Sequence, residues 1–210
     1  PPPAYSADEG SVFHAEAREV VEVTTALTDD QRLIARFWSD DPMLSPTPPG
    51  HWVSIALQVL DREGADAARQ ADVLARLGVA VADAFVGCWQ AKYEFDLLRP
   101  VTYIRRVVER QWEPLRITTP FPEYPSGHST QSGAAAAVLT AAFGEGYAFE
   151  DATHVDDGLP ARSYESFAAA AEEAAISRLY GGIHFRFGNE AGLAQGRGVG
   201  ALAAQLKTES

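Results

Sequence analysis

Three short motifs in this sequence combine side chains that bind a small anion. The first contains Lys92 and Arg99, with Pro100 directly after the arginine. If one helix continues to Arg99, the seven-residue spacing places both cations on one face, about 10 Å apart along the axis. Both cations can then converge on one anion. The structural alternative is an ion pair between Lys92 and Asp96 on a solvated helix face, and this motif alone favours that alternative.

The second motif lies between a proline-rich loop and an alanine-rich helix and consists of Pro125, Ser126, Gly127 and His128. Unpaired backbone N–H groups and the dipole at the start of a helix favour a bound anion. Ser126 adds a hydroxyl donor, Gly127 lets the backbone approach closely, and His128 can exchange a proton near neutral pH. The alternative is an ordinary serine cap followed by a surface histidine.

The third motif is Ser177-Arg178 followed by His184, with Gly181 and Gly182 between the arginine and the histidine. On an ideal helix, Arg178 and His184 point about 120° apart, so a shared target requires either that the long Arg178 side chain reaches round or that the glycines distort the turn. A structural histidine capped by backbone carbonyls is the alternative. Taken together, the three motifs supply fixed charge, directional donors and a group that can bond the central atom of a tetrahedral oxyanion.

The elements that must position these residues are predicted to be helices. Apolar spacing and end signals place helices at 12–26, from 28 onward, and at 51–60, 65–98, 129–143, 164–180 and 190–207. Proline, glycine and acidic residues place loops at 42–50, 111–124 and 150–160. Pro100 is expected to end the long helix at Arg99. No segment shows strong strand alternation, so the fold class is all-α, a bundle of about seven helices.

The composition limits the classes of partner. The chain has 17 basic and 29 acidic residues and a net charge of −12, which argues against a nucleic acid or an anionic membrane surface. No run of about 18 apolar residues is present, so no membrane-spanning helix is expected. The single cysteine, Cys88, cannot form an intramolecular disulfide. The 210 residues are predicted to form one helical domain.

In order and combination, the motifs resemble the signature shared by acid phosphatases and vanadium-dependent haloperoxidases: Lys-x6-Arg-Pro, then Pro-Ser-Gly-His, then Ser-Arg-x5-His. The resemblance extends from Trp89 to about Asn189 and implies a helical bundle of that type. It also implies a site that holds vanadate, or phosphate in its place. The residues implied to bind the equatorial oxygens are Lys92, Arg99, Ser126, Gly127 and Arg178. His184 would bond the central atom, as the ligand of vanadium, and His128 would be the general acid and base.

The resemblance favours the haloperoxidases at two further positions. Trp89 and Phe121 stand where fungal-type chloroperoxidases have an apolar halide pocket, and the string from Phe121 to Pro125 also looks like theirs. The alternative for both aromatic residues is plain core packing. The implied function is oxidation of halide by hydrogen peroxide to hypohalous acid, with Lys92 polarising the peroxide as a third catalytic residue beside His128 and His184.

One position departs from the superfamily pattern. Gly188, followed by Asn189, stands four residues after His184, where many members have an aspartate that orients the histidine. A histidine without a carboxylate partner is a poorer phosphoryl acceptor, so this departure counts against the alternative function, an acid phosphatase that forms a phosphohistidine. A third interpretation, from another class, is a non-catalytic fragment or scaffold.

The other histidines, His14, His51 and His154, are predicted to be structural or at the surface. His154 with Asp156 and Asp157 resembles a weak cation site, but the pattern favours an acidic solvated loop. By resemblance, the chain is expected to be the C-terminal, active-site part of a longer protein, with an oligomer or a further N-terminal helical part as its complement. The compartment is not set by the sequence, and only the resemblance favours a secreted or periplasmic protein.

Overall fold

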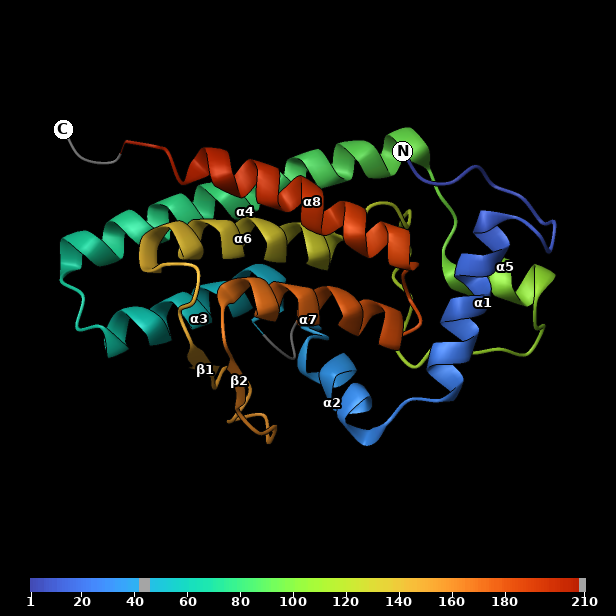
Figure 1. Ribbon diagram of the computed structural model, residues 1–210, viewed down its shortest axis with the longest axis horizontal. Coiled ribbons are helices and arrows are strands. Elements are labelled where there is room, and N and C mark those ends of the chain that lie inside the picture. The colour runs from blue at the N-terminus through green and yellow to red at the C-terminus, as the bar shows by residue number, and fades with distance from the viewer. Residues whose placement is uncertain (42–45, 208–210) are drawn as a thin grey trace.

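The computed structural model describes residues 1–41 and 46–207, and the described chain is mainly α-helical (Figure 1). Its elements, in chain order, are α1 (Val12–Thr25), α2 (Asp29–Phe37), α3 (Thr47–Arg62), α4 (Ala67–Phe95), α5 (Pro100–Val107), α6 (Gly127–Phe143), β1 (Phe149–Asp151), β2 (Arg162–Tyr164), α7 (Phe167–Tyr180) and α8 (Arg186–Ala203). The all-α prediction is confirmed. None of the described helices combines the length and apolar composition of a membrane-spanning segment.

Helix α6 lies at the centre of the bundle, in contact with α4, α7 and α8 (Figure 1). Its sequence, rich in alanine and without a charged residue, is buried nearly all round, as expected for a helix that has no solvated face. Because the anion motif at Ser126–His128 opens this helix, the centre of the bundle fixes the position of that motif.

Helices α6 and α8 approach each other closely because α8 presents three glycines, four residues apart, to its neighbour. A Cβ atom at Gly196 would lie only 2.0 Å from the carbonyl oxygen of Thr130, and one at Gly192 only 2.7 Å from that of Ser126. Backbone contact of this kind admits glycine alone. It brings the first turn of α8 against the first turn of α6, where two of the three motifs meet.

A second core, rich in aromatic side chains, joins α1 and α5 to the segment between α7 and α8. The ring centroid of Phe13 lies 5.0 Å from that of Tyr103 and 5.2 Å from that of Phe185. All three side chains are fully buried. Since Phe185 follows His184 directly, this core anchors the backbone that carries the third motif.

The predicted end of the long helix was wrong. Helix α4 ends at Phe95, where Asp96 adopts a left-handed conformation (φ 42°) and its N–H donates to the carbonyl of Lys92. Pro100 begins α5 instead, because proline fits the first turn of a helix, and Arg99 is its N-cap. Lys92 and Arg99 therefore do not share a helix face, and α5 is an element that the sequence interpretation did not include.

Three other boundaries also differ from the prediction. Helix α3 begins at Thr47, inside the expected loop, because Pro48 and Pro49 suit a first helical turn; residues 42–45 lie outside the described residues. The expected acidic loop at 150–160 is framed by an antiparallel pair, β1 and β2, in which Phe149 pairs with Tyr164. Three residues are too few to show strand alternation. Helix α8 spans Arg186–Ala203 rather than 190–207.

Candidate oxyanion-binding site

A cavity of about 390 Å³ opens where the three motifs meet. Seven of the nine predicted site residues line it: Trp89, Lys92, Phe121, Gly127, His128, Arg178 and His184. The other two, Arg99 and Ser126, are buried directly behind lining residues, because Arg99 contacts His184 and Ser126 precedes Gly127. The structure therefore brings together residues that are up to 95 positions apart in the chain.

Lys92 is fully buried and uses all three of its N–H donors on the loop that leads to α6. Its Nζ donates to the carbonyl oxygens of Pro122, Glu123 and Pro125, at 2.9, 2.9 and 2.6 Å. Burial lowers the pKa of Lys92 to about 8. Lys92 therefore fixes this loop and places a positive charge beside the cavity, and the alternative of a pair with Asp96 on a solvated face is wrong.

Arg99 links three segments at the back of the cavity. Its guanidinium donates to the carbonyl oxygens of Phe121 and Ile183, at 2.8 and 2.9 Å, and to the hydroxyl of Thr119 at 2.8 Å. Burial lowers the pKa of Arg99 to about 10, which leaves it charged at neutral pH. A buried cation without a full counter-charge favours a nearby anion.

His184 is buried and contacts a partner at each ring nitrogen. Nη1 of Arg99 lies 2.9 Å from Nε2, and since a guanidinium can only donate, Nε2 is the accepting nitrogen. The ring proton is then on Nδ1, which donates to Oε1 of Glu123 at 2.8 Å. Burial, with the charges of Arg99 and Lys92, holds the pKa of His184 well below its ordinary value. The ring is neutral, and Nε2, its unprotonated nitrogen, accepts from Arg99.

Glu123 is the site residue that the sequence interpretation missed. Its side chain is fully buried, and Oε1 also accepts the backbone N–H of Phe185 at 3.1 Å. Burial raises the pKa of Glu123 to about 7, against the opposing charges of Arg99 and Lys92. A lone glutamate in a proline-rich loop looks like a surface residue, so only its nearness to the second motif could have pointed to it.

The first turn of α6 carries Ser126, Gly127 and His128 as predicted. Ser126 is the N-cap, and its hydroxyl accepts the N–H of Ser129 at 3.4 Å. The side chain of His128 is 21% exposed and faces the cavity, where its Nε2 lies 3.4 Å from Nη1 of Arg178. Burial and the charge of Arg178 lower the pKa of His128 to about 3. A bound anion would oppose both effects and favour proton uptake by His128.

Arg178 reaches the cavity because α7 ends at Tyr180 and the two glycines turn the chain, with Gly182 at φ 73°. The predicted distortion is therefore present. The Nε of Arg178 donates to Ser177 at 3.0 Å, whereas within the described residues its terminal nitrogens make only long contacts, at 3.4 Å to His128 and to the Ala35 carbonyl. These terminal N–H groups are the ones best placed to bind an oxyanion.

The two predicted halide-pocket residues are neighbours on one wall of the cavity. The ring centroids of Trp89 and Phe121 lie 4.9 Å apart, and both rings are partly exposed to the cavity. Phe121 also lies 5.3 Å from Nζ of Lys92 and 4.8 Å from the guanidinium carbon of Arg99. This wall is apolar and adjacent to positive charge. Plain core packing does not describe side chains that line a cavity.

Asp40 also lines the cavity and belongs to a buried network of histidines. Its Oδ1 contacts Nδ1 of His51 at 2.9 Å and Nε2 of His154 at 3.2 Å, and its Oδ2 lies 3.9 Å from Nε2 of His128. Within the described residues, Oδ2 of Asp40 has no hydrogen-bond partner. The network continues to Asp151 through His51, at 2.8 Å.

These contacts settle the three histidines outside the motifs. His14, His51 and His154 are all buried, so the structural alternative is confirmed and the surface alternative is wrong. Ligand atoms of Asp40, His51 and His154 lie within 4.8 Å of one another. Hydrogen bonds among these groups account for that clustering. At the cation site suggested for His154 and its neighbours, Nδ1 of His154 instead donates a hydrogen bond to Asp157, at 2.9 Å.

The network makes stability depend on pH. Burial opposes the charged form of His51, but hydrogen bonds to Asp151 and Asp40 outweigh it and raise its pKa to about 9. A raised pKa in the folded state stabilises the fold below about pH 6.5, and this contribution, on the order of 3 kcal/mol, is lost as the pH rises through about 9. We expect the difference in unfolding free energy between wild type and His51→Gln, measured with urea, to shrink from pH 6 to pH 9. A constant difference would contradict the charged His51.

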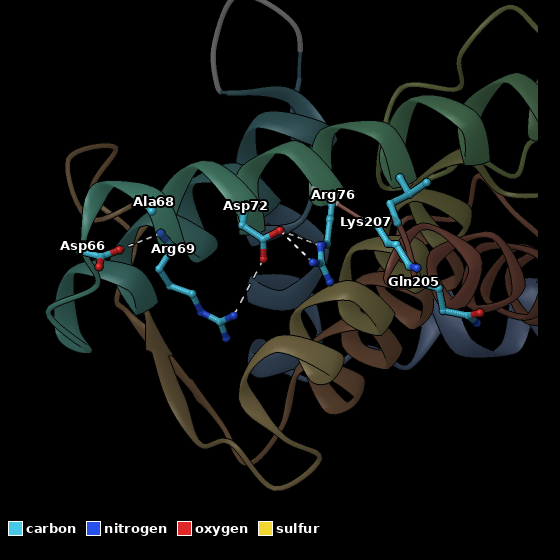
Figure 2. Close-up of a pocket in the computed structure, with 8 residues that line it drawn as sticks. Asp66, Ala68, Arg69, Asp72, Arg76, Gln205 and Lys207 are labelled. Atoms are coloured by element: carbon cyan, nitrogen blue, oxygen red, sulfur yellow. Dashed lines mark hydrogen bonds and ion pairs between the residues drawn. The ribbon is translucent and has the colours of Figure 1, made fainter. Parts of the chain in front are cut away.

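A second hollow lies on another part of the surface, between α4 and the C-terminal residues (Figure 2). Its charged side chains are occupied with structural contacts: Asp72 contacts Arg76 at 2.9 Å and Arg69 at 3.9 Å, and the two arginines donate to the carbonyls of Ala204 and Ala142. None of the motif residues lines this hollow. The motif cavity is therefore the candidate site.

Comparisons with known proteins agree with this geometry. The family model of the VCPO second helical-bundle domain matches residues 72–210. The structure of a bacterial vanadium-dependent iodoperoxidase is similar, with a TM-score of 0.92 and 46% sequence identity over 97% of this chain and 51% of that chain. A comparison with curated protein sequences gives no match.

Two structures of bacterial vanadium-dependent chloroperoxidase share the fold at lower identity. The holo form has a TM-score of 0.74 and 19% identity, covering 92% of this chain and 47% of that chain. The apo form has a TM-score of 0.77 and 18% identity, covering 98% and 51%. The present chain spans about half the length of these proteins. On its family match and its fold, the chain belongs to the vanadium haloperoxidase family, and its residues 72–210 match the second helical-bundle domain.

Proposed function

We propose that this chain holds vanadate in the motif cavity and oxidises halide with hydrogen peroxide to hypohalous acid. The observation that supports the proposal most strongly is the state of His184: a neutral ring that lines the cavity, with Nδ1 donating to Glu123 and the unprotonated Nε2 beside the cation Arg99. That arrangement is what a ligand of an oxyanion's central atom requires. Membership of the vanadium haloperoxidase family supports the same function.

The residues of the cavity fit vanadate. The terminal N–H groups of Arg178, the charge of Lys92 and the amide at Gly127 would hold the oxygens of vanadate, and Nε2 of His184 would bond the metal in place of its contact with Arg99. Arg99 lies behind His184 and Ser126 caps α6, so both act at the edge of the cavity. Phosphate has the same shape and charge type and fits the same donors. Bound vanadate supplies the activation of hydrogen peroxide toward halide.

The chain's own residues supply charge, proton transfer and a place for halide. In the overall reaction the halide loses two electrons, the O–O bond of peroxide breaks, and one proton is consumed as hypohalous acid and water form. His128, which lines the cavity, would hold and deliver that proton in general acid–base catalysis. Lys92 polarises the peroxide with its buried charge, and Trp89 with Phe121 forms the apolar side of the halide site.

The second candidate function is an acid phosphatase that uses the same cavity. Glu123 bears on this choice, because it gives His184 the carboxylate partner that Gly188 lacks. The argument against a nucleophilic His184 is therefore weaker than the sequence indicated, and family membership is what favours the haloperoxidase. In the phosphatase, Nε2 of His184 would attack phosphorus and His128 would protonate the leaving group.

We also propose that the chain is the active-site half of a longer haloperoxidase-like protein. It spans about half the length of the similar structures. Helix α4 carries Val79, Val86 and Tyr93 seven residues apart, and they are 42, 71 and 66% exposed. Seven residues are two helical turns, so these side chains form one apolar stripe that a further helical part could cover.

A paired assay of this chain tests the proposed function. With vanadate, hydrogen peroxide and halide, we expect halogenation of a phenolic dye, and without vanadate we expect little hydrolysis of an aryl phosphate. Hydrolysis without halogenation would support the phosphatase and overturn the proposal. Absence of activity in both assays would support the third interpretation, a fragment or scaffold without catalysis of its own.

A further inference from the structure

Glu123 reaches His184 from a different direction than the sequence pattern of the superfamily implies. It belongs to the loop before α6, whereas the expected carboxylate would lie four residues after His184, on α8. The Glu123 backbone is fixed on both sides, because its N–H donates to the carbonyl of Leu97 at 2.8 Å and its own carbonyl accepts Nζ of Lys92 at 2.9 Å. Its side chain therefore enters the interior from a rigid loop.

Gly188 leaves the space that the Glu123 carboxylate occupies. A Cβ atom at position 188 would lie 2.3 Å from Oε1 of Glu123 and 2.8 Å from Oε2. Even alanine is too large there while Glu123 keeps its position. The glycine at position 188 and the position of Glu123 therefore belong together. The residue that would carry a carboxylate on α8 is a glycine, and the carboxylate of Glu123, from the loop before α6, fills the space that a side chain there would occupy.

We propose that Glu123 is the positioning residue of His184, and that Glu123 with Gly188 replaces the carboxylate that other superfamily members carry on the helix after the histidine. The proposal deepens the proposed function and rests on the same oxyanion cavity. Glu123 acts through His184 and does not touch the bound oxyanion. By accepting hydrogen bonds from Nδ1–H and from the N–H of Phe185 beside it, Glu123 fixes both the ring orientation and the tautomer in which Nε2 is unprotonated.

The test moves the carboxylate from position 123 to position 188 and measures the binding of vanadate and of inorganic phosphate. Glu123→Ala is expected to weaken the binding of both anions by about 10- to 100-fold, as for other groups that orient a metal-bound histidine. Glu123→Gln, whose amide oxygen can still accept from Nδ1, is expected to bind better than Glu123→Ala. Glu145→Ala, at an exposed carboxylate in the turn after α6, is the matched control and is expected to bind like wild type.

The double variant Glu123→Ala/Gly188→Asp restores a carboxylate on α8 in the space that Glu123 leaves. We expect it to recover at least about tenfold of the affinity lost in Glu123→Ala, whereas Gly188→Asp alone places two carboxylates in one volume and binds poorly. Wild-type affinity in Glu123→Ala would overturn the proposal. So would a folded double variant, judged by circular dichroism, that binds no better than Glu123→Ala.

A second measurement needs no variant to fold. In wild-type protein with ¹⁵N-labelled histidine, we expect the His184 ring to show a protonated Nδ1 and an unprotonated Nε2 by NMR. The opposite tautomer would overturn the proposal. Since phosphate binding and the tautomer do not depend on halogenation, a chain that failed to halogenate but kept these responses would contradict the proposed function and leave the Glu123 assignment standing.

Discussion

His184→Ala is expected to lose vanadate, whereas His128→Ala is expected to keep it and lose most of its turnover. In the proposed site, His184 would supply the nitrogen that bonds the central atom, and alanine leaves nothing in its place. His128 lies at the cavity with 21% of its side chain exposed, and its proposed role is proton transfer rather than binding of the metal. Loss of a general acid and base typically costs about 10²- to 10⁴-fold in rate.

Equilibrium dialysis with vanadate and the dye-halogenation assay, run on the same preparations, separate the two variants. His14→Gln is the control, because His14 is a buried histidine that contacts Tyr103 and lies outside the cavity lining. If both variants lost vanadate equally, His128 would be a binding residue and its assigned role would be wrong. If the protein were a phosphatase, wild type quenched during turnover would yield a phosphorylated His184 peptide by mass spectrometry.

Arg178→Ala is expected to weaken vanadate binding by about 2 to 5 kcal/mol, because it removes a buried cation whose partner would be a desolvated anion. This range corresponds to about 30-fold to several thousand-fold in the dissociation constant. Arg178 is 2% exposed, and its terminal N–H groups make only long contacts in the part of the chain that the structure describes. The main fold does not depend on those contacts, so the variant is expected to remain folded.

Variants of two other arginines are compared with Arg178→Ala. Arg99→Ala is also expected to weaken vanadate binding, but Arg99 donates hydrogen bonds to Phe121, Ile183 and Thr119 as well. Part of the lost affinity would therefore come from displacement of the segments that these residues belong to. Arg197 pairs with Glu172 on the surface, and Arg197→Ala is expected to bind vanadate like wild type. Unchanged affinity in both Arg178→Ala and Arg99→Ala would place the oxyanion elsewhere.

The sequence predicted the cavity because its residues come from compact motifs. Pro125–His128 sits at the start of a helix for reasons visible in the sequence, and Gly181 with Gly182 correctly indicated that the helix before His184 is broken. Lys92 was correctly predicted to lie at the cavity, but the reason given for it was wrong. A shared helix face was expected for Lys92 and Arg99, but the left-handed Asp96 ends α4, and the two cations meet through the fold instead.

The residues that the sequence did not reveal act through long-range contacts. Glu123 and Gly188 are 65 positions apart, and neither has a local signature of its own role. Asp40 is likewise one acidic residue in a polar stretch, and its burial beside His51 and His154 depends on the packing of α2, α3 and the segment after β1. Patterns of spacing describe a helix or a loop, whereas these contacts depend on how the elements pack.

Competition between phosphate and vanadate tests the central claim, a single cationic cavity that holds a tetrahedral oxyanion through His184, Arg178 and the first turn of α6. In equilibrium dialysis, we expect one vanadate per chain, displaced in full by excess inorganic phosphate and absent from His184→Ala. Vanadate binding that is indifferent to a large excess of phosphate, or that persists in His184→Ala, would contradict the account.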